Sequence, residues 1–206
     1  AHAARVAVPK ERETDPNEAE EFESLKNGKI PEPITVSRDT EFFPTPDHIA
    51  DRLAEAAQVE HVGSVLEPSA GGASLLRAVV RRKSPNGLRH HFRMVAIEKD
   101  HTLFKTLSDY QHKNLAIFGN PHADFTLQNR RADFLDETPE EVGTFGAVLM
   151  NPPFSKGQDI AHIRHAFDFL GAGGRLAAIC SLGYQYNTQR KFQEFREWLE
   201  TVEHTA

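Results

Sequence analysis

The regular alternation of short apolar segments with amphipathic helices is the feature that most restricts the fold of this chain. Apolar runs predict five strands, at residues 64–67, 94–97, 125–129, 146–150 and 175–180. Helical spacing of apolar residues predicts helices at residues 47–57, 74–83, 101–112, 159–170 and 188–202. Strands that alternate with such helices form a parallel sheet with right-handed crossovers. The sequence therefore predicts an α/β fold, a mostly parallel sheet flanked by helices.

Charge divides the chain into a short arm and one larger domain. The formal net charge of the 206 residues is −6. Residues 11–23 contain seven acids and the single base Arg12, so this segment accounts for the whole net charge. We expect residues 1–30 to form an acidic, flexible arm and residues 31–206 to form the functional domain. Because that domain is electrically balanced, its charge does not exclude a polyanionic partner such as DNA.

The composition also argues against a secreted or membrane protein. The single cysteine, Cys180, excludes an internal disulfide framework and the common cysteine-rich zinc sites. No apolar run approaches the roughly eighteen residues of a membrane-spanning helix. We therefore expect a cytoplasmic protein with no membrane partner and no metal.

The end of the first predicted strand carries the first candidate motif. Glu67 is followed by Pro68, Ser69, Ala70 and Gly71. A parallel sheet binds ligands at the carboxyl ends of its strands, and the glycine allows a close approach to the backbone. The pattern is not the G-x-G-x-x-G of dinucleotide enzymes, and a carboxylate suits a cationic amine better than a pyrophosphate. An ordinary strand-to-helix turn is the alternative interpretation.

Polar residues also follow the second and third predicted strands. Glu98 and Lys99 come 27 and 28 residues after Gly71, where a carboxylate can accept both hydroxyls of a ribose. Asp133 and Phe134 follow the third strand and offer an acceptor and a ring where an adenine could lie. A solvated strand end is the alternative interpretation of Glu98.

The fourth strand is followed by the most informative motif. It reads Asn151, Pro152, Pro153, Phe154. The two prolines fix the backbone and remove N–H donors, so the Pro152 carbonyl and the Asn151 amide oxygen can point outward together. Two acceptors beside one aromatic plane match a planar base that bears an exocyclic amine.

These four motifs, in this order, resemble those of the S-adenosylmethionine-dependent amino-methyltransferases that modify N6 of adenine in DNA. The preceding run Phe42 to Pro46 resembles the segment that closes over the methionine end of the cofactor in that family, which gives the gamma-like motif order. The resemblance implies a Rossmann-like class I methyltransferase fold and S-adenosylmethionine as cofactor. It assigns catalysis to Asn151, Pro152, Pro153 and Phe154. It assigns cofactor binding to Phe43, Pro44, Thr45, Glu67, Pro68, Ser69, Ala70, Gly71, Glu98, Lys99, Asp133, Phe134 and Asn151.

The same resemblance implies a role for each part of the site. Glu98 would hold the ribose, Asp133 and Phe134 the adenine, and Thr45 and Glu67 the methionine portion. The target adenine would leave its duplex to stack on Phe154. The substrate expected is DNA, with RNA or a protein glutamine as alternatives for the same chemistry. A catalytically silent, nucleic-acid-binding subunit is the alternative from another class.

Two departures from the family pattern shape these expectations. Ala73 stands where the family usually has the second glycine of a Gly-x-Gly pair, which leaves the conformation of the loop open. No segment is left for a target-recognition domain, and the usual final strand hairpin is missing, so a separate subunit is expected to supply sequence specificity. Residues 155–165 resemble small methyltransferases of phages and mobile elements, which also suggests a restriction-modification setting.

Three further groups of residues have competing interpretations. A cationic run could follow a phosphate backbone or could only favour a helix C-terminus and a solvated loop; it comprises Arg77, Arg81, Arg82, Lys83, Arg89 and Arg93. Asp159, His162 and His165 could hold a metal. The expected roles are instead helix capping for Asp159, and contact with substrate or local packing for the two histidines. Tyr184 and Tyr186 could line the base pocket or pack within a loop.

Overall fold

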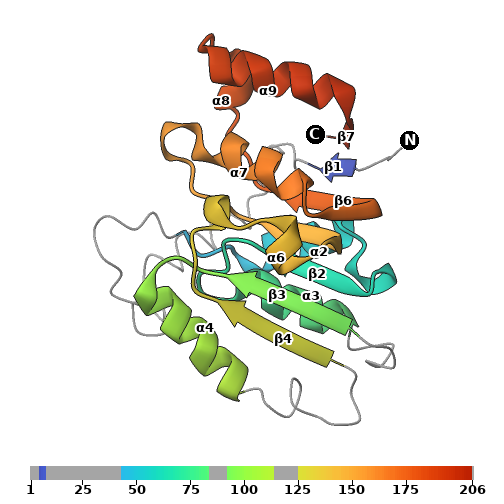
Figure 1. Cartoon of the computed structure of the whole chain (residues 1–206), viewed down its shortest axis with the longest axis vertical. Coiled ribbons are helices and arrows are strands. Elements are labelled where there is room, and N and C mark those ends of the chain that lie inside the picture. The colour runs from blue at the N-terminus through green and yellow to red at the C-terminus, as the bar shows by residue number, and fades with distance from the viewer. Residues whose placement is uncertain (1–4, 8–42, 84–91, 114–124, 206) are drawn as a thin grey trace, which may run out of the picture.

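A computed structural model describes residues 5–7, 43–83, 92–113 and 125–205. The described residues form one seven-stranded parallel sheet with the order β4-β3-β2-β5-β6-β1-β7 (Figure 1). The strands are β1 (Arg5–Ala7), β2 (Ser64–Glu67), β3 (Phe92–Ile97), β4 (Phe125–Arg130), β5 (Phe145–Met150), β6 (Leu170–Ala178) and β7 (Glu203–Thr205). The predicted α/β class with a parallel sheet is confirmed.

Helices cover both faces of this sheet. The α-helices are α2 (Asp47–Ala56), α3 (Ser74–Lys83), α4 (His101–Lys113), α6 (Pro139–Val142), α7 (Gln158–Phe167), α8 (Gly183–Tyr186) and α9 (Arg190–Thr201). Within the described ranges, three short 3-10 helices join them, η1 (Val59–His61), η3 (Phe134–Asp136) and η4 (Ser155–Gly157). Helices α2, α3 and α4 share one core with the sheet, and α6, α7 and α9 share the other.

The central strands β2 and β5 are largely buried on both faces because their side chains alternate between these two cores. Val65 and Leu66 are neighbours on β2, yet each belongs to a different core, and both are completely buried. Ala147 and Val148 divide in the same way on β5. A strand buried on both faces reads as a continuous apolar run, which explains why the short runs in the sequence predicted these strands.

The strand order reverses between β2 and β5, and this reversal positions the site. Val65 and Leu66 pair with Ala147 and Val148, so the two strands end at the same edge of the sheet. From β2 the chain proceeds outward through β3 and β4, then returns to β5 on the other side. In open α/β sheets, ligands bind outside the carboxyl ends of the strands at such a reversal.

Parts of the structure differ from the sequence-based expectations. The predicted helix over 159–170 ends at Phe167, and β6 begins at Leu170 instead of at residue 175. Gly174 explains this start, because a Cβ there would lie 2.9 Å from the Gly171 carbonyl oxygen and 3.0 Å from that of Phe145. The glycines therefore allow close contact between β5 and β6 across a bulge in their pairing.

The far edge of the sheet contains two strands that the sequence did not predict. β1 pairs in parallel with both β6 and β7, so β6 is covered on the side away from β5. β1 lies within the arm expected over residues 1–30; the rest of that arm lies outside the described residues. β7 runs parallel to its neighbour, and the described residues contain no antiparallel hairpin there. Among all the residues that the structure describes, no helix has the length and apolar character that crossing a bilayer requires.

Candidate functional site

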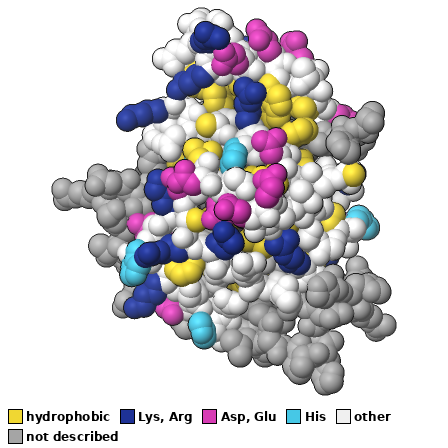
Figure 2. Space-filling view, in the orientation of Figure 1, with side chains coloured by type: hydrophobic (Ala, Val, Ile, Leu, Met, Phe, Trp, Pro, Cys, Tyr) yellow, Lys and Arg dark blue, Asp and Glu magenta, His cyan; other side chains and the backbone are white. Residues whose placement is uncertain are grey.

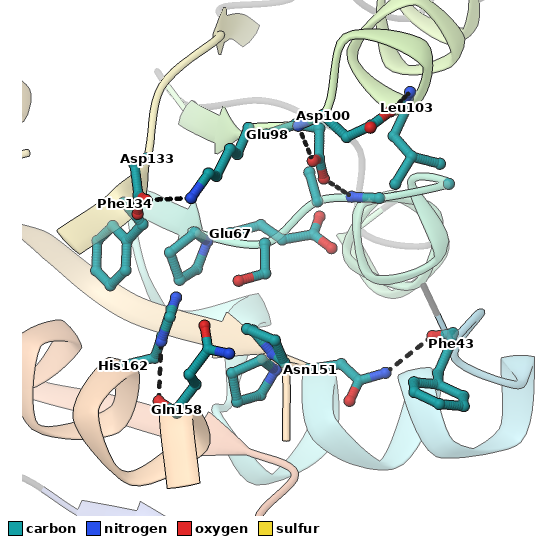
Figure 3. Close-up of a pocket in the computed structure, with 18 of the residues that line it drawn as sticks. Phe43, Glu67, Glu98, Asp100, Leu103, Asp133, Phe134, Asn151, Gln158 and His162 are labelled. Atoms are coloured by element: carbon teal, nitrogen blue, oxygen red, sulfur yellow. Dashed lines mark hydrogen bonds and ion pairs between the residues drawn. The ribbon is translucent and has the colours of Figure 1, made fainter. Parts of the chain in front are cut away.

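A pocket of about 530 Å³ opens at the carboxyl edge of the sheet, at the reversal between β2 and β5 (Figure 3). Every residue that the sequence suggested for catalysis or cofactor binding lines this pocket. Its volume lies within the range of small-molecule sites in proteins. The structure thus brings together motifs that are more than one hundred residues apart in the sequence.

Glu98 anchors the glycine-containing loop at one side of the pocket. One carboxylate oxygen accepts a hydrogen bond from the Gly71 N–H at 2.8 Å, and the other accepts one from the Asp100 N–H at 2.7 Å. Burial raises the pKa of Glu98, although both N–H groups favour its charged form. Each oxygen retains a second lone pair, so the carboxylate can position the loop and still accept a hydrogen bond from a ligand hydroxyl.

The loop adopts a left-handed conformation at both Gly71 and Ala73. Their φ angles are +48° and +65°. The missing second glycine therefore does not prevent a Gly-x-Gly geometry: Ala73 takes it at a cost of about 1–2 kcal/mol. Ala73 is completely buried, and its N–H donates to the Ala70 carbonyl at 2.8 Å, so packing and hydrogen bonding hold it there.

Glu67 is a buried carboxylate with an unused acceptor. Only 2% of the residue is exposed, and its Oε2 has no hydrogen-bond partner. Burial, followed by the nearby Glu98 carboxylate, raises the pKa of Glu67 well above its ordinary value. An unpaired carboxylate in an apolar setting is costly, and a cationic ligand would offset that cost. Figure 3 shows the Glu67 side chain across the middle of the pocket.

Asn151 has a fixed amide orientation. Its Nδ2 donates to the Phe43 carbonyl at 3.1 Å and to the Thr45 hydroxyl oxygen at 3.0 Å. A carbonyl can only accept, so the nitrogen side must face it. The opposite atom, Oδ1, is buried and has no partner. The segment before α2 therefore turns the acceptor of Asn151 away from itself and leaves it available to a donor (Figure 3).

Two aromatic rings flank Asn151 at the entrance of the pocket. The Phe43 and Phe154 ring centroids are 6.3 Å apart, with the planes tilted by 54°. Phe43 is 62% exposed, which is unusual for a large apolar side chain, whereas Phe154 is half-buried. Aromatic rings that stay accessible beside a pocket are suited to stacking on a planar ligand.

The opposite end of the pocket contains Asp133, Phe134 and His162. Asp133 accepts from Lys99 at 2.6 Å, and this pairing lowers the pKa of Asp133 and raises that of Lys99. His162 donates from Nδ1 to the Gln158 carbonyl at 2.9 Å, which leaves Nε2 as an acceptor in the neutral ring. Burial lowers the pKa of His162 and so favours that neutral form.

Gln158 was not among the predicted site residues, and His162 was expected only to contact substrate or to pack locally. Both line the pocket from α7, and Figure 3 shows the His162 ring pointing toward Phe134. Their spacing of four residues puts them on one helix face, directly after the Asn151 motif. That spacing was the sequence signal from which both residues could have been placed at the pocket. Other lining residues outside the prediction are Gly72, Ser74, Asp100, His101, Leu103, Ala132, Leu135 and Ser155.

The cationic run from Arg77 to Arg93 is largely occupied by internal contacts. Arg81 pairs with Asp51 at 2.8 Å, and Arg82 pairs with Glu60 at 3.0 Å. Lys83 donates to the Val62 carbonyl and lies over the Phe92 ring. These contacts favour the structural interpretation of the run over the phosphate-binding one. Arg89 lies outside the described residues.

The proposed metal ligands on α7 separate into different contacts. Asp159 accepts from the Ser181 N–H and hydroxyl at 2.9 and 2.6 Å, and His165 contacts the Glu137 carbonyl at 2.9 Å. No group of three or more metal-ligating side chains assembles within the described ranges. The two tyrosines also differ: Tyr184 packs edge-on against Phe195, whereas Tyr186 is 80% exposed, and neither lines the pocket.

Comparison with known families gives a match over most of this region. A family model described as N-6 DNA Methylase matches residues 34–162, which is more than half of the chain. The matched range contains all the strands that border the pocket and every predicted site residue.

Solved structures show the same fold at low sequence identity. A type I restriction-modification system methyltransferase subunit from Streptococcus thermophilus has a TM-score of 0.59 and 21% identity over 76% of this chain and 38% of its own. A modification subunit assigned to a type I restriction enzyme, from Vibrio vulnificus, has a TM-score of 0.59 and 16% identity over 91% and 44%. A protein assigned as a class I S-adenosylmethionine-dependent methyltransferase, from Listeria monocytogenes, has a TM-score of 0.55 and 14% identity over 90% and 57%.

These likenesses confirm the predicted Rossmann-like class I methyltransferase fold. The chain spans about two fifths of the length of the two restriction-modification subunits.

Proposed function

Because the chain belongs to the N-6 DNA methylase family, we propose that it transfers a methyl group from S-adenosylmethionine to the exocyclic N6 amine of adenine in DNA. The observation that carries this proposal is the orientation of Asn151. Its Nδ2 is tethered to Phe43 and Thr45, while its Oδ1 is buried, unpaired and beside the pocket. An acceptor held in this way suits an amine donor.

The pocket residues fit the proposed cofactor, which supplies an activated methyl group when it is bound. Glu67 offers the unpaired Oε2 to the cationic amine of the methionine portion. Glu98 and Lys99 lie at the end of β3, where we assign the ribose, and Asp133 and Phe134 lie where we assign the adenine. We also assign cofactor contacts to the lining segments 43–45 and 68–71. Two buried acceptors without protein partners support a ligand with donors at both places.

The catalytic motif would act mainly by positioning the target amine. Asn151 Oδ1 and the Pro152 carbonyl accept its two N–H groups, which directs the nitrogen lone pair away from the base plane. Pro153 limits the backbone freedom of the motif, and the Phe154 ring stacks on the base. The proton can leave to water once the nitrogen carries the methyl group, so the site needs no strong base. Orientation of this kind can supply a large part of a rate enhancement.

We also propose that a separate subunit supplies sequence recognition. The described residues share one α/β sheet, and two of the similar structures are described as subunits of type I restriction-modification systems. DNA is then the shared substrate of both partners.

A methyl-transfer assay with labelled S-adenosylmethionine tests the function. Duplex DNA, RNA and cell-extract protein are offered in parallel, and the digested products are identified by mass spectrometry. We expect N6-methyldeoxyadenosine with the wild type and its loss in Asn151→Ala. Asn187→Ala, the same chemical change outside the pocket, serves as the matched control and should retain activity.

The other outcomes have separate meanings. Label in RNA or in protein glutamine would replace the proposed substrate but keep the site. Absence of label from every pool, together with calorimetry that detects no S-adenosylmethionine binding, would favour a silent methyltransferase-like subunit.

A further inference from the structure

A cluster of three cations adjoins the catalytic loop. Lys156 lies in η4, two residues after Phe154, and Arg190 and Lys191 begin α9. The Lys191 ammonium donates to the Lys156 carbonyl, so the two segments are in contact. All three residues are exposed, and the Arg190 side chain is 90% exposed. Lys and Arg side chains gather at this corner of the molecule, where Figure 1 places α8 and the beginning of α9 (Figure 2).

The cluster is held in place by tight packing of the loop. Lys156 and Gly157 both have left-handed backbones, with φ angles of +52° and +71°. A Cβ on Gly157 would lie 2.9 Å from the Phe192 ring and 3.1 Å from the Lys191 ammonium. The Gly157 N–H also donates to the Phe154 carbonyl at 3.3 Å. The backbone that carries Lys156 and Lys191 therefore has a fixed position relative to the ring that we assign to base stacking.

These cations remain available to an external anion. Arg190 has an ion pair with Glu194 at 2.7 Å, but exposed pairs of this kind contribute only about 0–1 kcal/mol and are easily exchanged. Lys191 uses one of its three N–H donors on the Lys156 carbonyl. This availability contrasts with the end of α3, where Arg82 forms a partly buried pair with Glu60 of η1 and Lys83 donates to the Val62 carbonyl.

An exposed aromatic side chain lies on the same corner. Tyr186 ends α8 and is 80% exposed, the highest value among the large hydrophobic side chains in the described ranges. Its helix is fixed to α9, because Arg196 donates to the Tyr184 carbonyl at 2.6 Å and to the Asn187 carbonyl at 3.0 Å. Rigid exposure of an aromatic ring beside cations is typical of surfaces that bind nucleic acid.

We propose that Lys156, Arg190 and Lys191 bind the DNA phosphates that flank the target nucleotide, and that Tyr186 stacks on a neighbouring base. The inference rests on the proposed function, because it takes DNA as the substrate of the pocket. A base that leaves its duplex stays covalently tied to its own phosphates. Groups that contact those phosphates must therefore lie next to the ring that receives the base, as Lys156 lies next to Phe154.

The salt dependence of DNA binding tests the phosphate contacts. Fluorescence anisotropy with a labelled duplex is measured between about 50 and 200 mM salt. We expect the variant Lys156→Gln/Arg190→Gln/Lys191→Gln to reduce the slope of log K against log salt by about 2 to 3.

The control variant Arg52→Gln/Arg81→Gln/Lys105→Gln removes three exposed cations elsewhere and should leave that slope nearly unchanged. Both variants should bind S-adenosylmethionine as the wild type does, because none of these six residues lines the pocket.

The stacking role of Tyr186 is tested by substitutions that remove or keep its aromatic ring. Tyr186→Ala should weaken DNA binding by about 5- to 100-fold without changing the salt slope, and Tyr186→Phe should restore most of the affinity. If the slope of log K against log salt falls equally in the Lys156/Arg190/Lys191 variant and in the control variant, the effect is one of general charge and the proposal is overturned.

The remaining outcomes separate the surface from the proposed function. If the wild type methylates DNA but the variant Lys156→Gln/Arg190→Gln/Lys191→Gln keeps the wild-type salt slope, the proposed phosphate contacts are wrong and the proposed function stands. A wild type that binds S-adenosylmethionine and methylates RNA or protein, but not DNA, would overturn both.

Discussion

The orientation of Asn151 gives a prediction that can be worked out from two hydrogen bonds. Thr45 is 8% exposed, and its hydroxyl oxygen accepts from Asn151 Nδ2 at 3.0 Å. Thr45→Val replaces the hydroxyl by a methyl group of similar size and removes this acceptor. The second bond, to the Phe43 carbonyl at 3.1 Å, remains. The amide then keeps half of the contacts that favour its present orientation over the flipped one.

The expected size of the effect follows from the lost bond. A neutral hydrogen bond contributes about 0.5–1.5 kcal/mol, so Thr45→Val should lower kcat by about 2- to 12-fold. Asn151→Ala removes the acceptor itself, a loss that costs about 100- to 1000-fold in comparable sites. Thr45→Ser keeps the hydroxyl and should remain close to the wild type. The double variant Thr45→Val/Asn151→Ala should equal Asn151→Ala, because Thr45 acts on catalysis through Asn151.

The assay is steady-state methyl transfer to duplex DNA, with S-adenosylmethionine binding measured separately by calorimetry. The reasoning is refuted if Thr45→Val has the same effect in the Asn151→Ala background as in the wild type. That result would mean that the Thr45 hydroxyl acts only through its proposed contact with the cofactor and does not orient the amide.

Two further predictions concern stability. The raised pKa of Glu67 means that the folded protein binds a proton that the unfolded chain releases, so this residue lowers stability as pH rises above its ordinary pKa. Glu67→Gln should therefore raise Tm at pH 8 more than at pH 5, and it should weaken S-adenosylmethionine binding. The same change in Tm, relative to the wild type, at both pH values would contradict this reasoning. The second stability prediction concerns Gly146→Ala, which should lower the free energy of unfolding in urea by about 1–3 kcal/mol, because the added Cβ would lie 2.7 Å from Val62 Cβ. Gly183→Ala, whose nearest contact is 3.8 Å away, should be nearly neutral, and equal losses would exclude the steric explanation.

The central strands and the site could be predicted because their signals are local. A strand buried on both faces, such as β5, needs a continuous apolar run, and a polar motif directly after it must lie at the edge of the sheet. Asn151 and Glu67 could thus be placed in one pocket from sequence, although their separation is 84 residues. The same reasoning left His162 open between substrate contact and local packing, because a histidine on a helix gives no local sign that decides between them.

Strand pairing at the far edge depends on information that is not local. β1 and β7 each contain three residues, and their pairing joins segments almost two hundred residues apart. Such short segments have no periodicity that separates a strand from a loop. The outer part of the sheet is therefore set by neighbours that the sequence pattern does not reveal.

The charged residues illustrate the same limit at the level of function. The sequence shows the cations of α3 as an uninterrupted run, but the acids that pair with them, such as Asp51 and Glu60, come from other elements. The three cations proposed to bind phosphates, Lys156, Arg190 and Lys191, do not form a run in the sequence, because Lys156 is separated from Arg190 by more than thirty residues. Availability of a cation for phosphate depends on its neighbours in space, so the less conspicuous group in the sequence is the better candidate in the structure. The salt slopes of the two triple variants measure that difference directly.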